Sequence, residues 1–411
     1  MPEFFNVLAP QAAFEAIEPM LRADVEVDVV PTSDALGRVT AEDVVSPEDL
    51  PAFARSTMDG YSVRSRDTFG ASEGLPAYLD LVGEVPMGRA TEVELGIGQA
   101  ATAYTGGMLA RGADAVVMVE RTQVLDDTAI EVLRSVAPGE NVVQVGEDVR
   151  KGEPILSRGS AIRAQDIGGM LALGITSVAV NRKPVVGIIS TGDELVPTEE
   201  KVRPGQIRDI NSYTIAALVE QSGGKPKRIA LVSDEFEAQR QSAVEGLDTC
   251  DALVFSAGSS VSSRDLTADV LNSLGKPGVI VHGISIKPGK PTVVGAVSGK
   301  PVFGLPGNPV SAMVVFDLLV RPAIYHLSGC KTEPPQATAR ATLARDIPSV
   351  AGREDYVPVR LVHPIQGVTE AIPVFGKSNL IYTLVRSDGI VKVPLDKSGL
   401  YAGEAVDVRL F

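Results

Sequence analysis

Between residues 184 and 322 the chain alternates apolar runs with amphipathic stretches, and this pattern constrains its fold most strongly. The apolar runs are PVVGIIST (184–191), KRIALVSD (227–234), DALVFSAG (251–258) and KPVFGLPG (300–307). The stretches between them, such as NSYTIAALVEQSGG (211–224), have the spacing of helices that bury one side. Strands that are apolar along their whole length are typical of a parallel sheet covered on both faces. We therefore expect a three-layer αβα domain with a mostly parallel sheet.

Each of these apolar runs leads into a polar loop. The loops read STGDE (190–194), SDE (233–235), SAGSSVSSRD (256–265) and GLPGNPVS (304–311). In an open α/β sheet the ligand binds beyond the carboxyl ends of the strands. One polar loop is ordinary, but four of them at one predicted edge indicate a binding cleft.

Two of the loops have features that suit an anion. In GLPGNPVS, Asn308 suits the N-cap and Pro309 the first helical position. The amides of Val310 and Ser311 would then face a ligand, although a well-capped helix that binds nothing fits the same residues. SAGSSVSSRD could cradle a phosphate, but it is neither a P-loop nor a dinucleotide fingerprint. Asp265 in that loop could cap the next helix or hold a divalent cation.

The stretch SIKPGKPTVV (285–294) fixes two lysines, Lys287 and Lys290, in a frame of proline and glycine. Proline presets φ and glycine allows a turn or a close approach, so the two side chains have little freedom of position. The chain as a whole carries a formal net charge of −14. An acidic protein that binds an anion needs a focused positive patch, and we expect this pair to supply it.

Composition excludes several classes of protein. The acidic balance, 38 Lys+Arg against 52 Asp+Glu, argues against broad binding to nucleic acids or to membranes. Cys250 and Cys330 have no metal-like spacing and are too few for a disulfide framework, which favours a reducing compartment. We expect structural roles for the widely separated His282, His326 and His363, because their spacing does not suit zinc.

Targeting signals are not evident either. The first basic residue is Arg22, so no positive segment precedes an apolar one as in a signal peptide. The longest charge-free run, Pro301 to Phe316, contains three prolines and is too short to span a bilayer. These features predict a cytoplasmic protein.

Short β-like runs with frequent Gly and Pro lie on both sides of the αβα segment. Before it, from about 25 to 135, they include VEVDVV and AYLDLVGEV, and after it they extend from about 332 to 411. We expect a small, mostly antiparallel β domain in the first region and a second β domain in the other. In the first, MDGYSV predicts a turn at Asp59, and the segment from Thr105 reads as a loop into a strand.

Five motifs together resemble the molybdopterin molybdenumtransferases, the molybdenum-insertion enzymes related to the gephyrin E domain. They are MDGYSV, TGDEL, DINSYTIAAL, IKPGKP and GLPGNPVSA, and the resemblance extends from about residue 5 to 405 with the motifs in the same order. The resemblance implies a homodimer of elongated four-domain subunits. Such enzymes take adenylylated molybdopterin and molybdate, cleave the phosphoanhydride with the help of Mg²⁺, and release molybdenum cofactor and AMP.

The resemblance also implies the domain boundaries. Residues 1–30 with 141–182 would form a helical linker and dimerisation region, and 31–140 an inserted β domain. Residues 183–330 would form the molybdopterin-binding α/β domain, and 331–411 a C-terminal β domain. The implied fold class is therefore multidomain α/β plus β with an extended helical linker.

Site residues follow from the same motifs. Ligands for molybdate and the pterin phosphate would be Lys287, Lys290, Ser311, Arg353 and Ser378. An arginine suits a tetrahedral oxyanion because its fork presents paired donors.

The remaining assignments concern the nucleotide and the cleft. Ser260 and Asp265 match the nucleotide-phosphate loop, and Asp265 with Asp234 would be the magnesium carboxylates. Further implied cleft residues are Glu194, Asp59, Thr105 and Asp148, with Asp59 and Thr105 acting across the dimer interface. Either Glu194 or Asp265 could orient water, and the sequence does not choose between them.

Two other functions remain open at this stage. A noncatalytic, gephyrin-like pterin-binding scaffold would share the architecture, since fold alone does not fix function. A molybdopterin adenylyltransferase would share the central domain, but the flanking β domains argue against it. Molybdate and tungstate have nearly the same size and charge, so the oxyanion is also undecided. An upstream adenylyltransferase and the apo-molybdoenzymes that receive the cofactor are the protein partners to expect.

Overall fold

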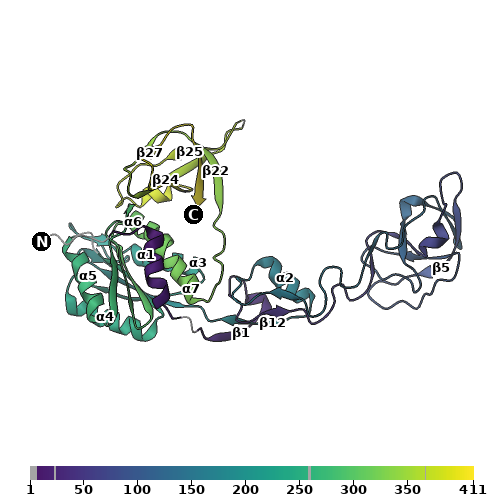
Figure 1. Ribbon diagram of the computed structural model, residues 1–411, viewed down its shortest axis with the longest axis horizontal. Helices are drawn as coiled ribbons and strands as arrows, with labels where there is room; N and C mark the ends of the chain where they lie inside the picture. The colour runs from purple at the N-terminus through teal and green to yellow at the C-terminus, as the bar shows by residue number, and fades with distance from the viewer. Residues whose placement is uncertain (1–6, 23–24, 258–260, 366) are drawn as a thin grey trace. The chain divides into compact units, whose positions relative to one another are not determined.

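A computed structural model describes residues 7–22, 25–257, 261–365 and 367–411, with the backbone alone for 261–265. The chain forms two compact units (Figure 1). Unit 1 comprises Met1–Glu42, Arg158–Arg163 and Val178–Phe411, and unit 2 comprises Asp43–Ser157 and Ala164–Ser177.

Unit 1 contains the predicted central sheet. Its six strands have the order β16-β13-β17-β21-β20-β18. Their bounds are β13 (Val185–Thr191), β16 (Lys225–Val232), β17 (Ala252–Ala257), β18 (Pro277–His282), β20 (Val293–Val297) and β21 (Lys300–Pro306). The four strands formed by the apolar runs pair in parallel, whereas β20 is antiparallel to both of its neighbours. The expected mostly parallel sheet is confirmed, and the four polar segments follow the carboxyl ends of its strands. Residues 261–265 of SAGSSVSSRD are the start of α5 (Val261–Ser273), so Asp265 lies within that helix and does not cap it, contrary to one of the two expectations.

Helices cover both faces of this sheet, as its apolar strands require (Figure 1). On one face lie α4 (Phe236–Thr249) and α5 (Val261–Ser273). On the other lie α1 (Pro10–Ile17), α3 (Asn211–Gln221) and α6 (Pro309–Val315). The core on the first face includes Phe255 and the core on the second face includes Phe303, and both side chains are fully buried. The predicted αβα domain is therefore present with a separate apolar core on each side of the sheet.

The helix that begins with α6 continues through a π-helical segment, η5 (Phe316–Val320), into α7 (Arg321–Leu327). This stretch, Pro309–Leu327, is the one helix of the described residues that is long and apolar enough to cross a membrane. However, 61% of its most apolar window is buried inside the protein. It packs as a core helix. Pro309 begins it at a position where no amide is needed, whereas Pro322 lies inside it, just after the π-helical segment.

The C-terminal part of unit 1 is a small β-barrel. Its strands are β22 (Thr338–Leu343), β24 (Glu354–Val362), β25 (Glu370–Pro373), β26 (Gly389–Val393) and β28 (Ala405–Leu410). The order β24-β25-β22-β28-β26 closes through a further pairing of β24 with β26. A short strand from the central part, β19 (Ile286–Lys287), adds to β24 in parallel. The barrel is therefore joined to the central domain by main-chain pairing.

Unit 2 is built on a second sheet, of order β7-β4-β6-β5-β9-β8. Its strands are β4 (Gly60–Val63), β5 (Ala77–Glu84), β6 (Gln99–Ala103), β7 (Ala115–Met118), β8 (Thr122–Asp126) and β9 (Ala129–Val132). All of their pairings are antiparallel except β5 with β6, so the prediction of a mostly antiparallel domain is confirmed. This unit also holds the helix α2 (Ala164–Ala172).

Short elements complete the chain. They are β1 (Val27–Pro31), β2 (Val44–Val45), β3 (Arg55–Ser56), β10 (Val142–Val143), β11 (Pro154–Leu156), β12 (Ser177–Asn181), β14 (Leu195–Val196), β15 (Ile207–Arg208), β23 (Ile347–Pro348), β27 (Gly399–Leu400), α8 (Tyr382–Val385), η1 (Glu18–Met20), η2 (Thr32–Asp34), η3 (Ser65–Thr68) and η4 (Val119–Arg121). The predicted linker segments thus contain strand pairs, such as β1 with β12, in addition to a helix.

The burial of Phe316 gives a test of the core between the sheet and its helices. Phe316 is fully buried, and we expect Phe316→Ala to lower the free energy of unfolding by about 3–5 kcal/mol because it removes an aromatic ring and leaves a cavity. Urea denaturation followed by circular dichroism measures the change. The same substitution at Phe69, which is 62% exposed, should cost less than about 0.5 kcal/mol. Equal effects of the two substitutions would contradict the packing described.

Candidate active site

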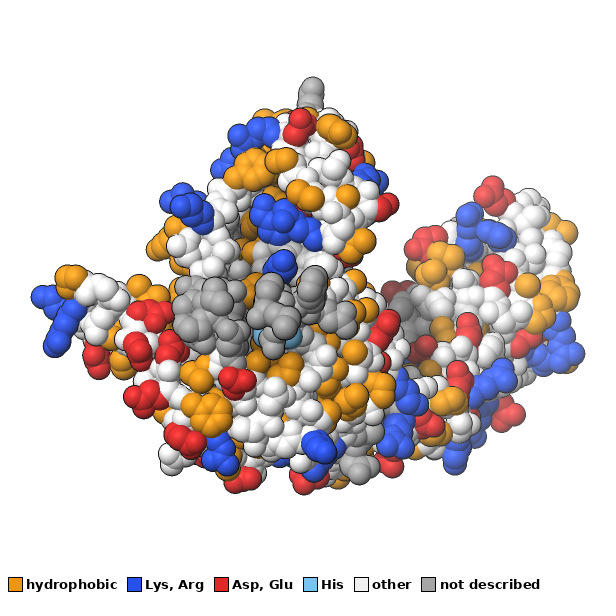
Figure 2. All heavy atoms as spheres, turned by 60° about the vertical axis from the view of Figure 1, so that its left-hand side comes forward, with side chains coloured by type: hydrophobic (Ala, Val, Ile, Leu, Met, Phe, Trp, Pro, Cys, Tyr) orange, Lys and Arg blue, Asp and Glu red, His pale blue; other side chains and the backbone are white. Residues whose placement is uncertain are grey.

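A cavity of about 1030 Å³ opens in unit 1 where the barrel meets the central domain. Most of its lining comes from four segments: the loop 285–291, the start of α6, the turn and strand 351–358, and the loop 374–379. Figure 2 shows Lys and Arg side chains gathered in the hollow below the C-terminal lobe. A cavity of this size, with few polar groups converging on it, is suited to a small-molecule ligand.

The lysine loop is placed by strand pairing on one side and close packing on the other. Ile286 and Lys287 pair with Glu354 and Asp355 of β24. Gly289 has φ +116°, and a Cβ on it would lie 2.6 Å from a methyl of Val315. Only glycine fits there, so Gly289 is required for the loop to pass over the helix that begins with α6.

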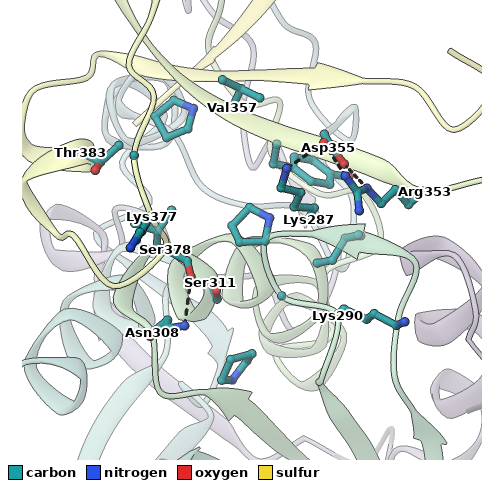
Figure 3. A pocket seen from close by; sticks show the side chains of 18 of the residues that line it. Lys287, Lys290, Asn308, Ser311, Arg353, Asp355, Val357, Lys377, Ser378 and Thr383 are labelled. Atoms are coloured by element: carbon teal, nitrogen blue, oxygen red, sulfur yellow. Dashed lines mark hydrogen bonds and ion pairs between the residues drawn. The ribbon is translucent and has the colours of Figure 1, made fainter. Parts of the chain in front are cut away.

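A buried carboxylate holds two of the cavity's cations. Asp355 has a side chain only 4% exposed, and its Oδ1 accepts a 2.8 Å hydrogen bond from Nε of Arg353. Its Oδ2 lies 3.4 Å from Nη2 of Arg353 and 3.9 Å from Nζ of Lys287 (Figure 3). Sequence reasoning missed Asp355. The signal was available, since residues two apart in a strand lie on one face and the pattern Arg-x-Asp leads into β24.

The start of α6 differs in part from the prediction. Asn308 occupies the N-cap position, but its side chain makes no capping hydrogen bond. Its Nδ2 instead donates to Oγ of Ser378 at 3.0 Å (Figure 3). The amide of Val310, expected to face a ligand, donates to the carbonyl of Ser378 at 3.1 Å. One of the two amides predicted to face an anion is therefore not free, because it already donates a hydrogen bond to a carbonyl of the barrel loop.

The cavity brings together all five residues expected to bind the oxyanion and the pterin phosphate. Ser311 is nearly buried at 3% exposure, and Lys290 lines the opposite side with its ammonium extending away from Ser311 (Figure 3). Lys377, which the sequence analysis missed, adds a further cation beside Ser378. Nothing in the spacing of FGKSNL distinguished that lysine from an exposed one.

A separate group of carboxylates lies at the carboxyl edge of the sheet. The amide of Asp234, just after β16, donates to the carboxylate of Asp193 at 3.1 Å. Burial, and then the charges of Asp193 and Glu194, raise the pKa of Asp234. Its Oδ1 is buried and has no hydrogen-bond partner. Among the described residues no three His, Cys, Asp or Glu side chains are grouped to hold a metal, and the cavity's described lining does not include Glu194 or Asp234.

Three of the expected residues belong to unit 2. There, Oδ1 of Asp59 accepts hydrogen bonds from the amide of Thr105 at 2.8 Å and from its hydroxyl at 3.0 Å. The amide bond, and then the hydroxyl bond, lower the pKa of Asp59. Asp148 is exposed, and its amide donates to the carbonyl of Leu50. Asp59 and Thr105 are thus brought together as a pair, and Asp148 is not part of it. Ser260 and the side chain of Asp265 lie outside the described residues.

The fold and cavity define a multidomain α/β protein with a cation-lined ligand site beside the carboxyl edge of its sheet. Three family models match the chain: MoeA N-terminal region (domain I and II) over residues 8–174, probable molybdopterin binding domain over 187–326, and MoeA C-terminal region (domain IV) over 340–411. The chain belongs to this family, that of the molybdopterin molybdenumtransferases.

Individual relatives resemble the chain over nearly its whole length. A Methanocaldococcus jannaschii protein named for molybdopterin biosynthesis is 37% identical over 98% of this chain and 96% of its own. The molybdopterin molybdenumtransferase of Bacillus subtilis is 33% identical, covering 94% and 90%. The crystal structure of the molybdopterin biosynthesis MoeA protein of Pyrococcus horikoshii is 32% identical, with a TM-score of 0.85 over 99% and 100% of the two chains.

The close packing at Gly289 can be tested by stability. Gly289→Ala places a methyl against side chains of Val315 and Ile286 at a positive φ, and we expect it to lower the free energy of unfolding by about 1–3 kcal/mol. Gly205→Ala is the matched control, because Gly205 also has a positive φ of +88° but no atom within 4 Å of the added methyl. Urea denaturation of both variants measures the difference. A smaller loss at Gly289 than at Gly205 would refute the packing argument.

Proposed function

We propose that this chain inserts molybdenum into adenylylated molybdopterin, with hydrolysis of the phosphoanhydride to give molybdenum cofactor and AMP. The observation that carries the proposal is the cation-lined cavity in a chain of net charge −14. The described lining includes four cations, Lys287, Lys290, Arg353 and Lys377, against one carboxylate. Both substrates are anions, and relatives that match this chain nearly end to end are named molybdopterin molybdenumtransferase.

In this proposal the cavity holds molybdate and the pterin phosphate. Molybdate is a tetrahedral dianion, and Arg353 offers it the donors of Nη1, which Asp355 leaves free, while Lys287 supplies a second charge. The hydroxyls of Ser311 and Ser378 can donate to its oxygens from the start of α6 and from the barrel loop. Lys290, at the side of the cavity, is assigned to the substrate phosphate.

Hydrolysis requires a water oxygen to form a bond to phosphorus while the bridging P–O bond breaks and its electrons stay on the leaving phosphate. Glu194 or Asp265 would orient that water and accept its proton, and Ser260 would donate to the nucleotide phosphate. We assign Asp59, Thr105 and Asp148 to the same cleft, with Asp59 and Thr105 acting across the interface of a homodimer.

Asp234 suits a magnesium ion. Its buried Oδ1 lacks a partner, and its raised pKa reflects a carboxylate that a nearby cation would keep ionised. Mg²⁺ is commonly held by one or two carboxylates together with substrate phosphates, so Asp234 with Asp265 would suffice. When bound, the ion neutralises charge on the anhydride oxygens.

The chain is assigned to the cytoplasm as a homodimer that receives its substrate from a molybdopterin adenylyltransferase and delivers cofactor to apo-molybdoenzymes. The four domains are assigned at 1–30 with 141–182, 31–140, 183–330 and 331–411. Nucleic acids and membranes are not among the proposed partners, in keeping with the acidic composition.

The lysine loop gives the first test of this function. We expect Lys287→Ala to weaken molybdate binding at least about tenfold, because a charge beside a dianion is lost, and to slow AMP release from adenylylated molybdopterin. Calorimetry measures the first effect and a turnover assay the second, with Lys201→Ala, an exposed lysine outside the cavity, as control. Wild type that binds molybdate but releases no AMP would instead be a scaffold. ATP consumption with metal-free molybdopterin would indicate an adenylyltransferase.

Asp234 gives a pH dependence. Because burial and the charges of Asp193 and Glu194 raise its pKa, protons compete with a metal at a pH above the ordinary value for aspartate, about 3.9. We expect the affinity for Mg²⁺, titrated calorimetrically without nucleotide so that only protein groups titrate, to fall as the pH is lowered toward that raised pKa. Asp234→Asn should be weaker throughout and nearly independent of pH. Glu237→Gln, on an exposed ion pair of α4, should retain the wild-type profile. A flat wild-type profile would remove Asp234 from the metal site.

A further inference from the structure

Asp355 is the one carboxylate among the described residues that line the cavity, and it lies in an unusual position for a site that attracts anions. Its side chain is 4% exposed and contacts Arg353 through both carboxylate oxygens. It also lies opposite Lys287 in the β19–β24 register, with 3.9 Å between Oδ2 and Nζ. One buried carboxylate therefore joins two cations that come from distant parts of the chain (Figure 3).

The charge of Asp355 alone works against an anion, since a carboxylate near a dianion repels it. Its contacts work in the other direction. Arg353 is a long side chain, 35% exposed, and fixing it in one rotamer before the ligand arrives removes an entropic cost from binding. The carboxylate engages Nε and Nη2, which leaves Nη1 of Arg353 without a hydrogen bond to any described residue.

Two possible roles of Asp355 thus predict opposite changes in anion affinity when its charge is removed. If it only tempers the positive field, removing its charge strengthens anion binding. If it holds the guanidinium in place, removing its charge weakens binding even though the cavity becomes more positive. The burial of Asp355 and its contact with Arg353 through both oxygens favour the role of holding the guanidinium in place. A carboxylate that only lowered the positive potential would need neither the burial nor the two-oxygen contact.

We propose that Asp355 is a positioning residue that holds Arg353, and with it Lys287, in the orientation that receives the oxyanion. The inference rests on the proposed function, because it takes molybdate as the ligand of this cavity. Asp355 itself does not contact the ligand. Its effect passes through the guanidinium fork, whose Nη1 remains available to a tetrahedral oxyanion while the other two nitrogens are occupied.

The test is a double-mutant cycle on the full chain, with molybdate titrated calorimetrically. Asp355→Asn keeps the size of the side chain and removes its charge, and we expect it to weaken molybdate binding about tenfold, within the range for directly coupled residues. In the Arg353→Ala background the same change should no longer weaken binding. Asp407→Asn, which breaks an exposed ion pair with Arg340 elsewhere on the barrel, should leave binding unchanged.

The possible outcomes are distinct. Tighter binding by Asp355→Asn, or an equal loss with and without Arg353, would overturn the positioning role. Absence of molybdate binding by the wild-type protein would instead refute the proposed function. If Asp355→Asn does not fold, Arg353→Lys keeps the charge but lacks the fork, and we expect a comparable weakening. Wild-type affinity in Arg353→Lys would equally overturn the inference.

Discussion

The cavity depends on the short parallel pairing of β19 with β24, in which two residues of each strand take part. Ile286 and Lys287 leave the central domain and pair in parallel with the first residues of β24, and the amide of Glu354 donates to the carbonyl of Ser285 at 2.9 Å. Main-chain hydrogen bonds fix register, and register decides which side chains face each other. Because Lys287 is registered with Asp355, the lysine loop and the arginine of the barrel meet at one carboxylate. A shift of β19 by one residue would turn Lys287 to the face opposite Asp355.

A second attachment holds the opposite wall. Ser378, on a barrel loop, accepts a hydrogen bond from the Val310 amide through its carbonyl and one from Asn308 through its hydroxyl. A third contact, 2.9 Å between Asp317 and Arg409, joins the helix that begins with α6 to β28. The three attachments come from separate places on the barrel and meet one loop and one helix. The distance between Lys287 and Ser311 is therefore set by tertiary structure and not by a flexible linker.

The sequence predicted the parts of this arrangement that are encoded locally. Apolar runs specified the four parallel strands because a strand buried on both faces cannot be polar, and the Pro-Gly frame located Lys287 and Lys290. Asp355 was not found although the local pattern Arg-x-Asp offered a signal, because a carboxylate beside a predicted anion site looks unfavourable until its contacts with Arg353 and with Lys287 of the central domain are seen. The use of the Val310 amide by Ser378 was also beyond prediction, because the two residues are distant in sequence and no local pattern couples them. Residues whose role depends on a partner from another domain require the structure.

A cationic cavity can bind anions in an acidic chain because salt screens the cavity from the distant negative charges of the surface. At physiological ionic strength, charges more than about 8 Å apart on the surface are largely screened. An anion at the cavity therefore responds to Lys287, Arg353 and their neighbours far more than to the net charge of −14. Within that short range, the orientation of each donor matters as much as its charge. A carboxylate that neutralises part of the field but fixes a guanidinium can thus increase affinity, and selectivity for a tetrahedral oxyanion would follow from the geometry it fixes.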